Sequence, residues 1–324
     1  MNPSPGGVEI LDLEPAASEF LAEAVAGLSS SPPTLPSKFF YDERGSDLFL
    51  KICELPEYDI TRTELAILRE FAPEMAESIG GNAELVGFGT GAGLKTRMLL
   101  EQLKNPIAYV PVDISKQRLM DSADALHAAM PSLEILPVCA DYLQPIRLPT
   151  PSRKPDHVAV YFPGSTIGNL EPPTARDFLE RVAELCGRSG GLIIGVDLQK
   201  STATLEAAYN DRAGVTAEFN LNLLVRANRE LGADFDLSCW QHRAVYNEPA
   251  GRIEMHLISR GDQHVHLGGQ TFRFCDGEKI ITEYSYKHTP QGFVRLAEAA
   301  GFRMSHMWTD ADKLFAVFHF VTRD

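Results

Sequence analysis

The fold is decided by residues 84–96, ELVGFGTGAGLKT. The first five residues are an apolar run typical of a buried strand, and the glycines at 89, 91 and 93 predict a tight turn. Helical spacing follows, with Leu94, Met98, Leu99 and Leu103 near one stripe. Small residues between a strand and a helix N-terminus let backbone N–H groups approach an anionic ligand closely. The stretch therefore predicts a strand–turn–helix unit that binds a ligand.

The same alternation continues along the chain. We expect strands at 108–113, 133–138, 157–162 and 192–196. Ser115 is expected to cap a helix running to Met130, and Phe178, Leu179, Val182 and Leu185 mark one face of a later helix. Repeated βα units with apolar strands indicate a parallel-dominated sheet with helices on both faces, a Rossmann-like α/β core.

The alternation of strands and helices stops after Asp197. Residues 204–231 are expected to be helical, and 252–259 and 279–286 alternate as antiparallel strands do. A helix at 291–300 and strands at 302–308 and 314–321 then resume the earlier pattern.

We therefore expect a core of residues 61–200 and 288–324, and an inserted α+β domain of residues 201–287. Residues 1–60 would form an N-terminal arm contributing to that domain. The arm carries a helical pattern at 16–28, a Ser/Pro-rich linker at 29–37, and helical spacing over 41–71 that Pro56 interrupts.

Composition excludes several classes of protein. The chain has 324 residues and a net charge of −14, which repels phosphate backbones and anionic membrane surfaces. No apolar run approaches the roughly 18 residues that span a bilayer. Five scattered cysteines form no CxxC pair, so we expect no metal site and no disulfide framework. We expect a cytoplasmic monomer that binds neither nucleic acid nor membrane.

Polar residues follow three consecutive predicted strands. Gly89 opens the turn after the first strand, Asp113 ends the second and suits ribose hydroxyls, and Asp141 follows the third and suits an adenine amine. Tyr142 would lie against the adenine ring. Lys95 would meet a carboxylate, or be a solvated helix residue. These features predict a nucleotide-type cofactor, and the glycine pattern alone admits both NAD and S-adenosylmethionine.

Seven further runs carry a resemblance. The chain resembles the histidine Nα-methyltransferases of ergothioneine biosynthesis over residues 38–320. The runs that carry it are FYDERGS at 40–46, LPEY at 55–58 with TR at 61–62, KTR at 95–97, PGSTIGN at 163–169, AYND at 208–211, RIEM at 252–255 and TEYSYK at 282–287.

The resemblance implies a class I methyltransferase core and S-adenosylmethionine-dependent conversion of L-histidine to its trimethylated betaine, hercynine. It places the cofactor on Gly89, Lys95, Asp113, Asp141 and Tyr142. The family's acid before this turn is replaced by Gly87, followed by Phe88.

The resemblance also implies the substrate residues. Tyr58, Asn169 and Tyr209 would hold the amino and carboxylate end of the amino acid, and Glu283 and Ser285 would hydrogen-bond the imidazole. Tyr41 and Met255 would lie nearby. Tyr284 and His288 stand where relatives carry other residues, and a tyrosine beside Glu283 is expected to reshape the pocket.

Tyr41, Tyr58 and Glu283 are the candidate catalytic residues, because a tyrosine or carboxylate within reach eases proton loss from the amine. Of the three possible roles for Glu283, binding the imidazole explains the residue better than acting as a base or being an exposed acid on a strand. The tyrosines would attract the quaternary ammonium product, although tyrosines and methionines such as Met255 also serve as core residues. Asn169 would equally suit a turn or a helix N-cap.

Three other functions stay open on the residues alone. One is the same methylation of another amino acid, such as tryptophan or tyrosine, or of a related amine. The second is a nicotinamide-dependent oxidoreductase, although no proton-relay motif typical of a dehydrogenase is present. The third is a sensor that binds the cofactor without catalysis.

Overall fold

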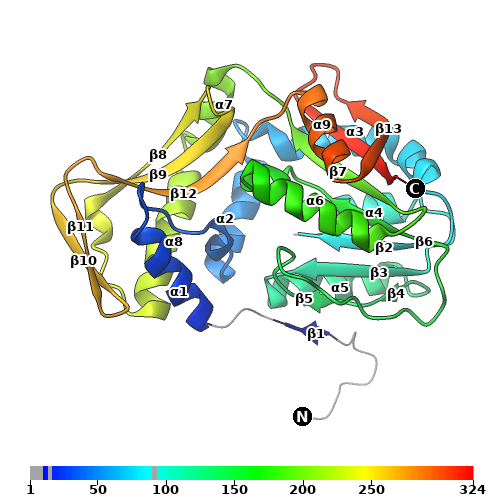
Figure 1. The fold of residues 1–324 in the computed structure, drawn as a ribbon, viewed down its shortest axis with the longest axis horizontal. Coiled ribbons are helices and arrows are strands. Elements are labelled where there is room, and N and C mark those ends of the chain that lie inside the picture. Colours follow the sequence, from blue (N-terminus) through cyan, green and yellow to red (C-terminus); the bar gives the residue numbers. More distant parts are fainter. Residues whose placement is uncertain (1–9, 14–16, 90–92, 324) are drawn as a thin grey trace, which may run out of the picture. The chain divides into compact units, whose positions relative to one another are not determined.

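The computed structural model describes residues 10–13, 17–89 and 93–323, and these form two compact units (Figure 1). Unit 1 contains the described residues of Met1–Glu14, Thr63–Leu198 and His288–Asp324. Unit 2 contains those of Pro15–Arg62 and Gln199–Lys287. Each unit is therefore built from segments that are distant in the sequence.

In the described part of the chain, unit 1 is built on a nine-stranded sheet. In spatial order its strands are β1 (Leu11–Asp12), β5 (Val138–Cys139), β3 (Ala108–Asp113), β2 (Ala83–Phe88), β6 (His157–Phe162), β7 (Gly191–Asp197), β14 (Phe315–Thr322) and β13 (Phe302–Thr309), with β4 (Glu134–Ile135) beside β3. The strands from β1 to β7 are parallel, and β14 is antiparallel to both of its neighbours. The order reverses beside β2, where a doubly wound sheet binds its ligand.

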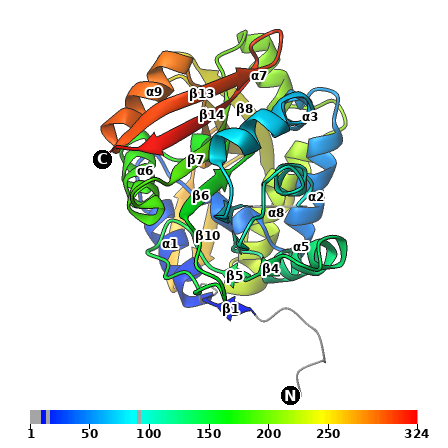
Figure 2. The same cartoon turned by 90° about the vertical axis from the view of Figure 1, so that its right-hand side faces the viewer.

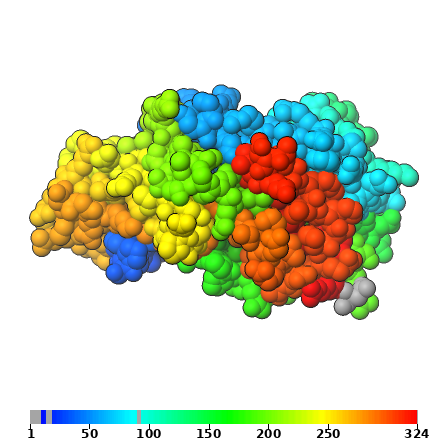
Figure 3. All heavy atoms as spheres, turned by 90° about the horizontal axis from the view of Figure 1, so that it is seen from above, coloured from blue at the N-terminus to red at the C-terminus, as the bar shows by residue number. Residues whose placement is uncertain are grey.

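Helices cover both faces of this sheet, α6 and α9 on one side and α3 and α5 on the other (Figure 2). The helices are α3 (Asp59–Ile79), which begins in unit 2, α4 (Leu94–Leu100), α5 (Lys116–Ala129), α6 (Pro172–Cys186) and α9 (Pro290–Ala299). In the space-filling view, the C-terminal part of unit 1 forms a continuous orange-to-red surface (Figure 3). The predicted Rossmann-like class I core is confirmed.

The core of unit 1 explains why these strands are so apolar. Every residue of β2 and β7 is buried. Side chains such as Val86, Val160 and Ile194 pack with Phe178 of α6 and Phe293 of α9 in one cluster. Each such buried side chain contributes about 1.5–3 kcal/mol relative to exposure. A strand buried on both faces needs apolar residues at every position, and the unbroken runs in the sequence reflect this.

Unit 2 contains an antiparallel sheet packed on helices. Its sheet has the order β12 (Lys279–Tyr286), β9 (Arg252–Ser259), β8 (Trp240–Asn247), and a separate hairpin joins β10 (Gln263–Leu267) to β11 (Gln270–Phe274). The helices are α1 (Ala17–Leu28), η1 (Ser37–Phe40), α2 (Glu43–Glu54), α7 (Thr202–Tyr209), α8 (Val215–Leu231) and η3 (Leu237–Cys239). Helix α8 packs against both α2 and β8, and so joins the N-terminal segment to the sheet.

The structure corrects the single helix expected over 204–231, which is divided between α7 and α8. The second helix begins at Val215, and the carboxylate of Asp211 accepts the N–H groups of Val215 at 2.9 Å and Thr216 at 2.8 Å. Gly214 adopts a φ of +75°, which favours glycine. The apolar periodicity continues across this break and conceals it.

Three smaller expectations were met only in part. The strand expected at 133–138 is two short strands, β4 and β5. Ser115 is the N-cap residue of α5, as expected, but its side chain makes no cap hydrogen bond, and its backbone N–H donates to Asp113 Oδ1 at 2.9 Å. Helix α3 continues past Phe71 to Ile79 with Pro73 inside it. None of the helices in the described ranges is long and apolar enough to cross a membrane.

Candidate active site

The carboxyl ends of three neighbouring strands of unit 1 bring the predicted cofactor residues to one edge of the sheet. Gly89, with a φ of +60°, follows β2 and donates its N–H to the Val112 carbonyl at 3.0 Å. Asp113 ends β3, and Asp141 follows β5 and accepts the Leu143 N–H at 2.9 Å. Residues 90–92 of the expected glycine turn lie outside the described residues.

Tyr142 joins this edge to an aromatic group. Its ring lies 5.4 Å from Phe162, 5.8 Å from Phe88 and 5.9 Å from Phe178, measured between centroids. Burial raises the pKa of Tyr142 above its usual value, and the charges of Asp113 and Asp141 add to the effect. The phenol therefore stays protonated beside two carboxylates.

Lys95 makes an ion pair that the sequence did not predict. Its Nζ donates to Glu64 Oε2 at 2.5 Å, and both oxygens of Glu64 lie 3.0 Å from the Gly164 N–H. Glu64 is fully buried, and a Cβ at Gly195 would lie only 2.4 Å from its Oε1. Lys95 is thus not a simply solvated helix residue, and one of its donors is already used by Glu64 before any ligand binds. Glu64 lies two residues after the Thr61-Arg62 run. Its closeness to that run was the only feature of the sequence that could have pointed to it.

Unit 2 gathers the predicted tyrosines into one aromatic group. Tyr58 lies 6.2 Å from Tyr209 and 6.4 Å from Phe49 between ring centroids. Tyr41 lies 5.6 Å from Phe49 and 5.8 Å from Phe219. The sequence did not single out Phe49 and Phe219, because apolar aromatics on α2 and α8 resemble ordinary core residues.

Tyr58 is buried, and burial raises its pKa well above its usual value. Nearby Tyr209, Cys53, Tyr41 and Glu283 raise it further, in that order. The Tyr58 hydroxyl therefore remains an O–H donor over the whole physiological range. It is suited to orient a substrate by hydrogen bonding, and it is unsuited to act as a base.

Glu283 lies in β12 directly opposite Met255 of β9. Enclosure raises the pKa of Glu283 to about 7, and the charge of Lys287 partly opposes that rise. No described residue donates a hydrogen bond to this partly buried carboxylate, and the residue opposite it on the neighbouring strand, Met255, is apolar. A carboxylate that is desolvated and still lacks a donor is a strong acceptor for a ligand N–H.

Ser285, Tyr209 and Lys287 form a closed triangle of hydrogen bonds. The Tyr209 hydroxyl lies 2.8 Å from Ser285 Oγ, and Lys287 Nζ lies 3.0 Å from the first and 2.8 Å from the second. All three side chains are buried. The predicted residues for the two ends of an amino acid, Tyr209 and Ser285, are therefore in direct contact.

Comparison with known proteins identifies the family. A family model described as "Histidine-specific methyltransferase, SAM-dependent" matches residues 20–322. This chain belongs to that family.

Its relatives include histidine N-alpha-methyltransferases of two mycobacteria. The protein from Mycolicibacterium smegmatis is 40% identical over 93% of this chain and 94% of its own length. The protein from Mycobacterium tuberculosis is 40% identical over 89% of this chain and 90% of its own length. Ergothioneine biosynthesis protein 1 of Neurospora crassa is 32% identical over 86% of this chain, which matches 32% of that longer protein.

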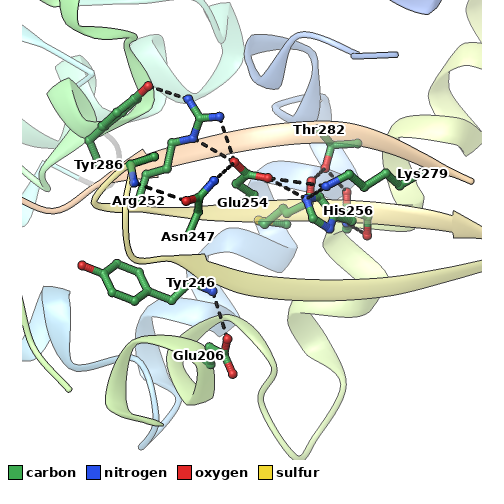
Figure 4. A network of polar contacts seen from close by, with 12 residues as sticks. Glu206, Tyr246, Asn247, Arg252, Glu254, His256, Lys279, Thr282 and Tyr286 are labelled. Atoms are coloured by element: carbon green, nitrogen blue, oxygen red, sulfur yellow. Dashed lines mark hydrogen bonds and ion pairs between the residues drawn. The ribbon is translucent and has the colours of Figure 1, made fainter. Parts of the chain in front are cut away.

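In this histidine-specific methyltransferase, Tyr284 does not reshape the face that carries Glu283, which corrects the expectation. Successive strand residues point to opposite faces, and the Tyr284 ring packs under the Arg252 guanidinium at 3.6 Å. Arg252 also bonds Glu254 at 2.8 Å and the Tyr286 hydroxyl at 2.6 Å. Figure 4 shows Arg252, Glu254 and Asn247 together on one side of the sheet, and Glu206 on the other.

Besides the cofactor residues, two further residues that the sequence singled out, Asn169 and His288, lie in unit 1. Asn169 ends η2 (Thr166–Asn169), just after β6, where it is half-buried and neither caps a helix nor adopts a positive φ. His288 pairs with Leu198 beside the sheet and packs on Phe293 at 5.1 Å. The structure therefore brings Tyr41, Tyr58, Tyr209, Met255, Glu283 and Ser285 together in unit 2, and it assigns Asn169 to the other unit.

Proposed function

We propose that this chain transfers three methyl groups in turn to the α-amine of L-histidine, producing hercynine for ergothioneine biosynthesis. The observation that carries the assignment of residues is the partly buried Glu283 carboxylate, which has no donor among the described residues and lies beside the hydroxyl of Ser285. An imidazole presents both an N–H and an acceptor nitrogen, and it would satisfy this pair.

The edge of the unit 1 sheet suits S-adenosylmethionine. Asp113 would hold the ribose, Asp141 and Tyr142 the adenine, and Gly89 would allow close approach to the backbone. Lys95, tied to Glu64, would face the methionine carboxylate with its remaining donors. When bound, the cofactor supplies an electrophilic methyl group on a sulfonium sulfur.

The side chains of unit 2 would position the amine and exclude water. Aligning the reactants is the main requirement of an in-line displacement. Tyr58 would donate its hydroxyl hydrogen to the amino acid, since its phenol stays protonated. The faces of Tyr41, Tyr58 and Tyr209 would attract the growing ammonium cation, which after the third transfer donates no hydrogen bond. We also propose that the protein acts as a cytoplasmic monomer.

Mass spectrometry tests this function. Purified protein is incubated with S-adenosylmethionine and the twenty common amino acids, and the products are scanned for added methyl groups. We expect histidine alone to gain three. Methylation of tryptophan or tyrosine in its place would retain the reaction and contradict the substrate. Binding of S-adenosylhomocysteine without any methylation would support the sensor function instead.

A further inference from the structure

Lys287 is buried at 3% exposure in the middle of the substrate residues, and the proposed chemistry gives it no task. It directly follows β12 and is the last residue of unit 2, two residues after Ser285. Its Nζ also lies 4.9 Å from the centroid of the Tyr209 ring. Burying a lysine is costly, so its contacts with two hydroxyl groups need an explanation.

The hydrogen bonds of the triangle fix the direction of each donor. A lysine ammonium only donates, so both hydroxyl oxygens accept from Lys287. Between Tyr209 and Ser285 one hydroxyl must donate to the other. A phenol is much more acidic than an aliphatic alcohol, and the adjacent ammonium strengthens it further as a donor. Tyr209 therefore donates, and Ser285 accepts.

This arrangement determines what Ser285 offers to a ligand. Its oxygen accepts from both Lys287 and Tyr209, which uses its two lone pairs. Its own O–H then remains to be donated. Glu283, on the same face, is a carboxylate with no described donor. The face thus presents one donor and one acceptor, in fixed roles.

We propose that Lys287 is a positioning residue that holds the Ser285 hydroxyl as a hydrogen-bond donor, so that the site selects a ring with one acceptor nitrogen and one N–H group. The inference rests on the proposed function, and it adds the residue that sets substrate specificity. Neutral imidazole has this pattern. A pyrrole has no acceptor nitrogen, and a pyridine has no N–H. A site built to pair a polar group rejects analogues that leave the group unpaired.

The test compares histidine with the two pyrrolylalanine isomers, which keep a ring N–H at one position or the other and have no acceptor nitrogen. We expect wild-type kcat/KM for histidine to exceed that for either isomer by about 100-fold. In Lys287→Met this preference should fall about tenfold, mainly through a higher KM for histidine. Affinity for S-adenosylhomocysteine should not change.

Two further variants separate positioning from a structural role. Ser285→Ala should reduce the preference to near unity, and adding Lys287→Met to it should change the preference little, since both act through one hydroxyl. Lys279→Met makes the same chemical change elsewhere on β12, where Nζ contacts His256, and should leave the preference intact. If Lys287→Met does not fold, the wild type and Ser285→Ala still test whether the hydroxyl donates.

The outcomes distinguish the two proposals. Absence of histidine methylation by the wild type would overturn the proposed function and this inference with it. Normal histidine methylation with an unchanged preference in Lys287→Met, or with equal wild-type rates on histidine and a pyrrolylalanine, would overturn the inference alone.

Discussion

Glu283 occupies surroundings that oppose its charge, and its pKa is raised to about 7. The ionised carboxylate is the stronger acceptor for an imidazole N–H, because its hydrogen bond is charge-assisted. We therefore predict that the KM for histidine rises as pH falls from 8 to 6, because a proton on Glu283 removes the charge that strengthens this hydrogen bond. Steady-state kinetics across this range measure the effect.

The variant Glu283→Gln separates this titration from that of the substrate. It should raise the KM for histidine by about 10- to 100-fold at pH 8, the loss of one charge-assisted hydrogen bond. Its KM should then follow only the titration of histidine itself. Glu248→Gln, an exposed acid in the same unit, is the matched control. An unchanged pH profile in Glu283→Gln would contradict the role given to the carboxylate.

The same residue should lower the stability of the free protein. A carboxyl whose pKa is raised on folding binds its proton more tightly in the folded state, so stability falls as pH rises from about 4.5 to about 7. Glu283→Gln should therefore increase the unfolding free energy at pH 8 by about 1–3 kcal/mol. Urea denaturation at pH 8 and pH 5 measures this, and the gain should shrink several-fold at the lower pH. A variant less stable than wild type at pH 8 would show that Glu283 is a structural residue.

Glu64 has the opposite character, since its carboxylate is fully buried and already paired with Lys95 and Gly164. Removing its charge would leave a part-buried ammonium without its partner. We predict that Glu64→Gln destabilises the protein by about 2–4 kcal/mol and weakens S-adenosylmethionine binding. Calorimetry with the cofactor and thermal denaturation provide the two measurements. Glu74→Gln on the same helix is the control, and equal effects in both would contradict a specific role.

At the scale of elements, β12 and β9 separate two functions by the alternation of their side chains. One face carries Met255, Glu283 and Ser285, and the other carries the ion pair of Arg252 and Glu254. A bulge lies between Ile281 and Glu283. The register of this pair decides which residues face the site, since a shift by one residue would exchange the faces.

The Arg252–Glu254 pair is therefore predicted to stabilise the register. Glu254 is 5% exposed, and hydrogen bonds from Arg252, Asn247 and His256 outweigh burial and lower its pKa to about 2. Arg252→Met would leave this carboxylate without its main partner. We expect a loss of about 3 kcal/mol at pH 7. The loss should shrink as pH falls from about 4.5 toward 2, because the wild type also loses the pair there.

Chemical denaturation at pH 7 and pH 3 measures both effects. Arg260→Met is the matched control, because Arg260 is exposed and its guanidinium donates to the Gln241 side chain, with no acid bonded to it among the described residues. A loss at pH 7 no larger than that of the control would contradict the assigned role.

At the scale of the whole molecule, the chain forms two units with distinct candidate ligands. We predict that S-adenosylhomocysteine slows amide hydrogen exchange in unit 1 at the ends of β2 and β3 and around Asp141. Histidine should slow exchange in unit 2 along β12 and α7. Amide hydrogen exchange followed by mass spectrometry, with each ligand added separately, measures this, because a bound ligand suppresses local opening. NADH is the control, and protection by NADH at the strand ends would favour the oxidoreductase.

How much the sequence could predict differs between the two units. In unit 1 the strands are buried on both faces, so their apolar runs at 84–88, 157–162 and 192–196 match β2, β6 and β7 closely. In unit 2 the helix over 204–231 was wrong, because amphipathic spacing passes through Asp211 and Gly214 without a change. The spacing of apolar residues indicates which side of a helix is buried, but it does not indicate where the helix ends.

By itself the sequence determined the α/β class, the family and the residue types at the strand ends, because these follow from local patterns and from short motifs. Only the tertiary structure decided which groups meet. Glu64 is paired with Lys95, from which it is 31 residues distant, and Tyr209 with Ser285, 76 residues away. It also placed Tyr284 on Arg252, away from the face of Glu283. Such pairings depend on packing and strand register, which bring distant segments together and leave no mark in either segment alone.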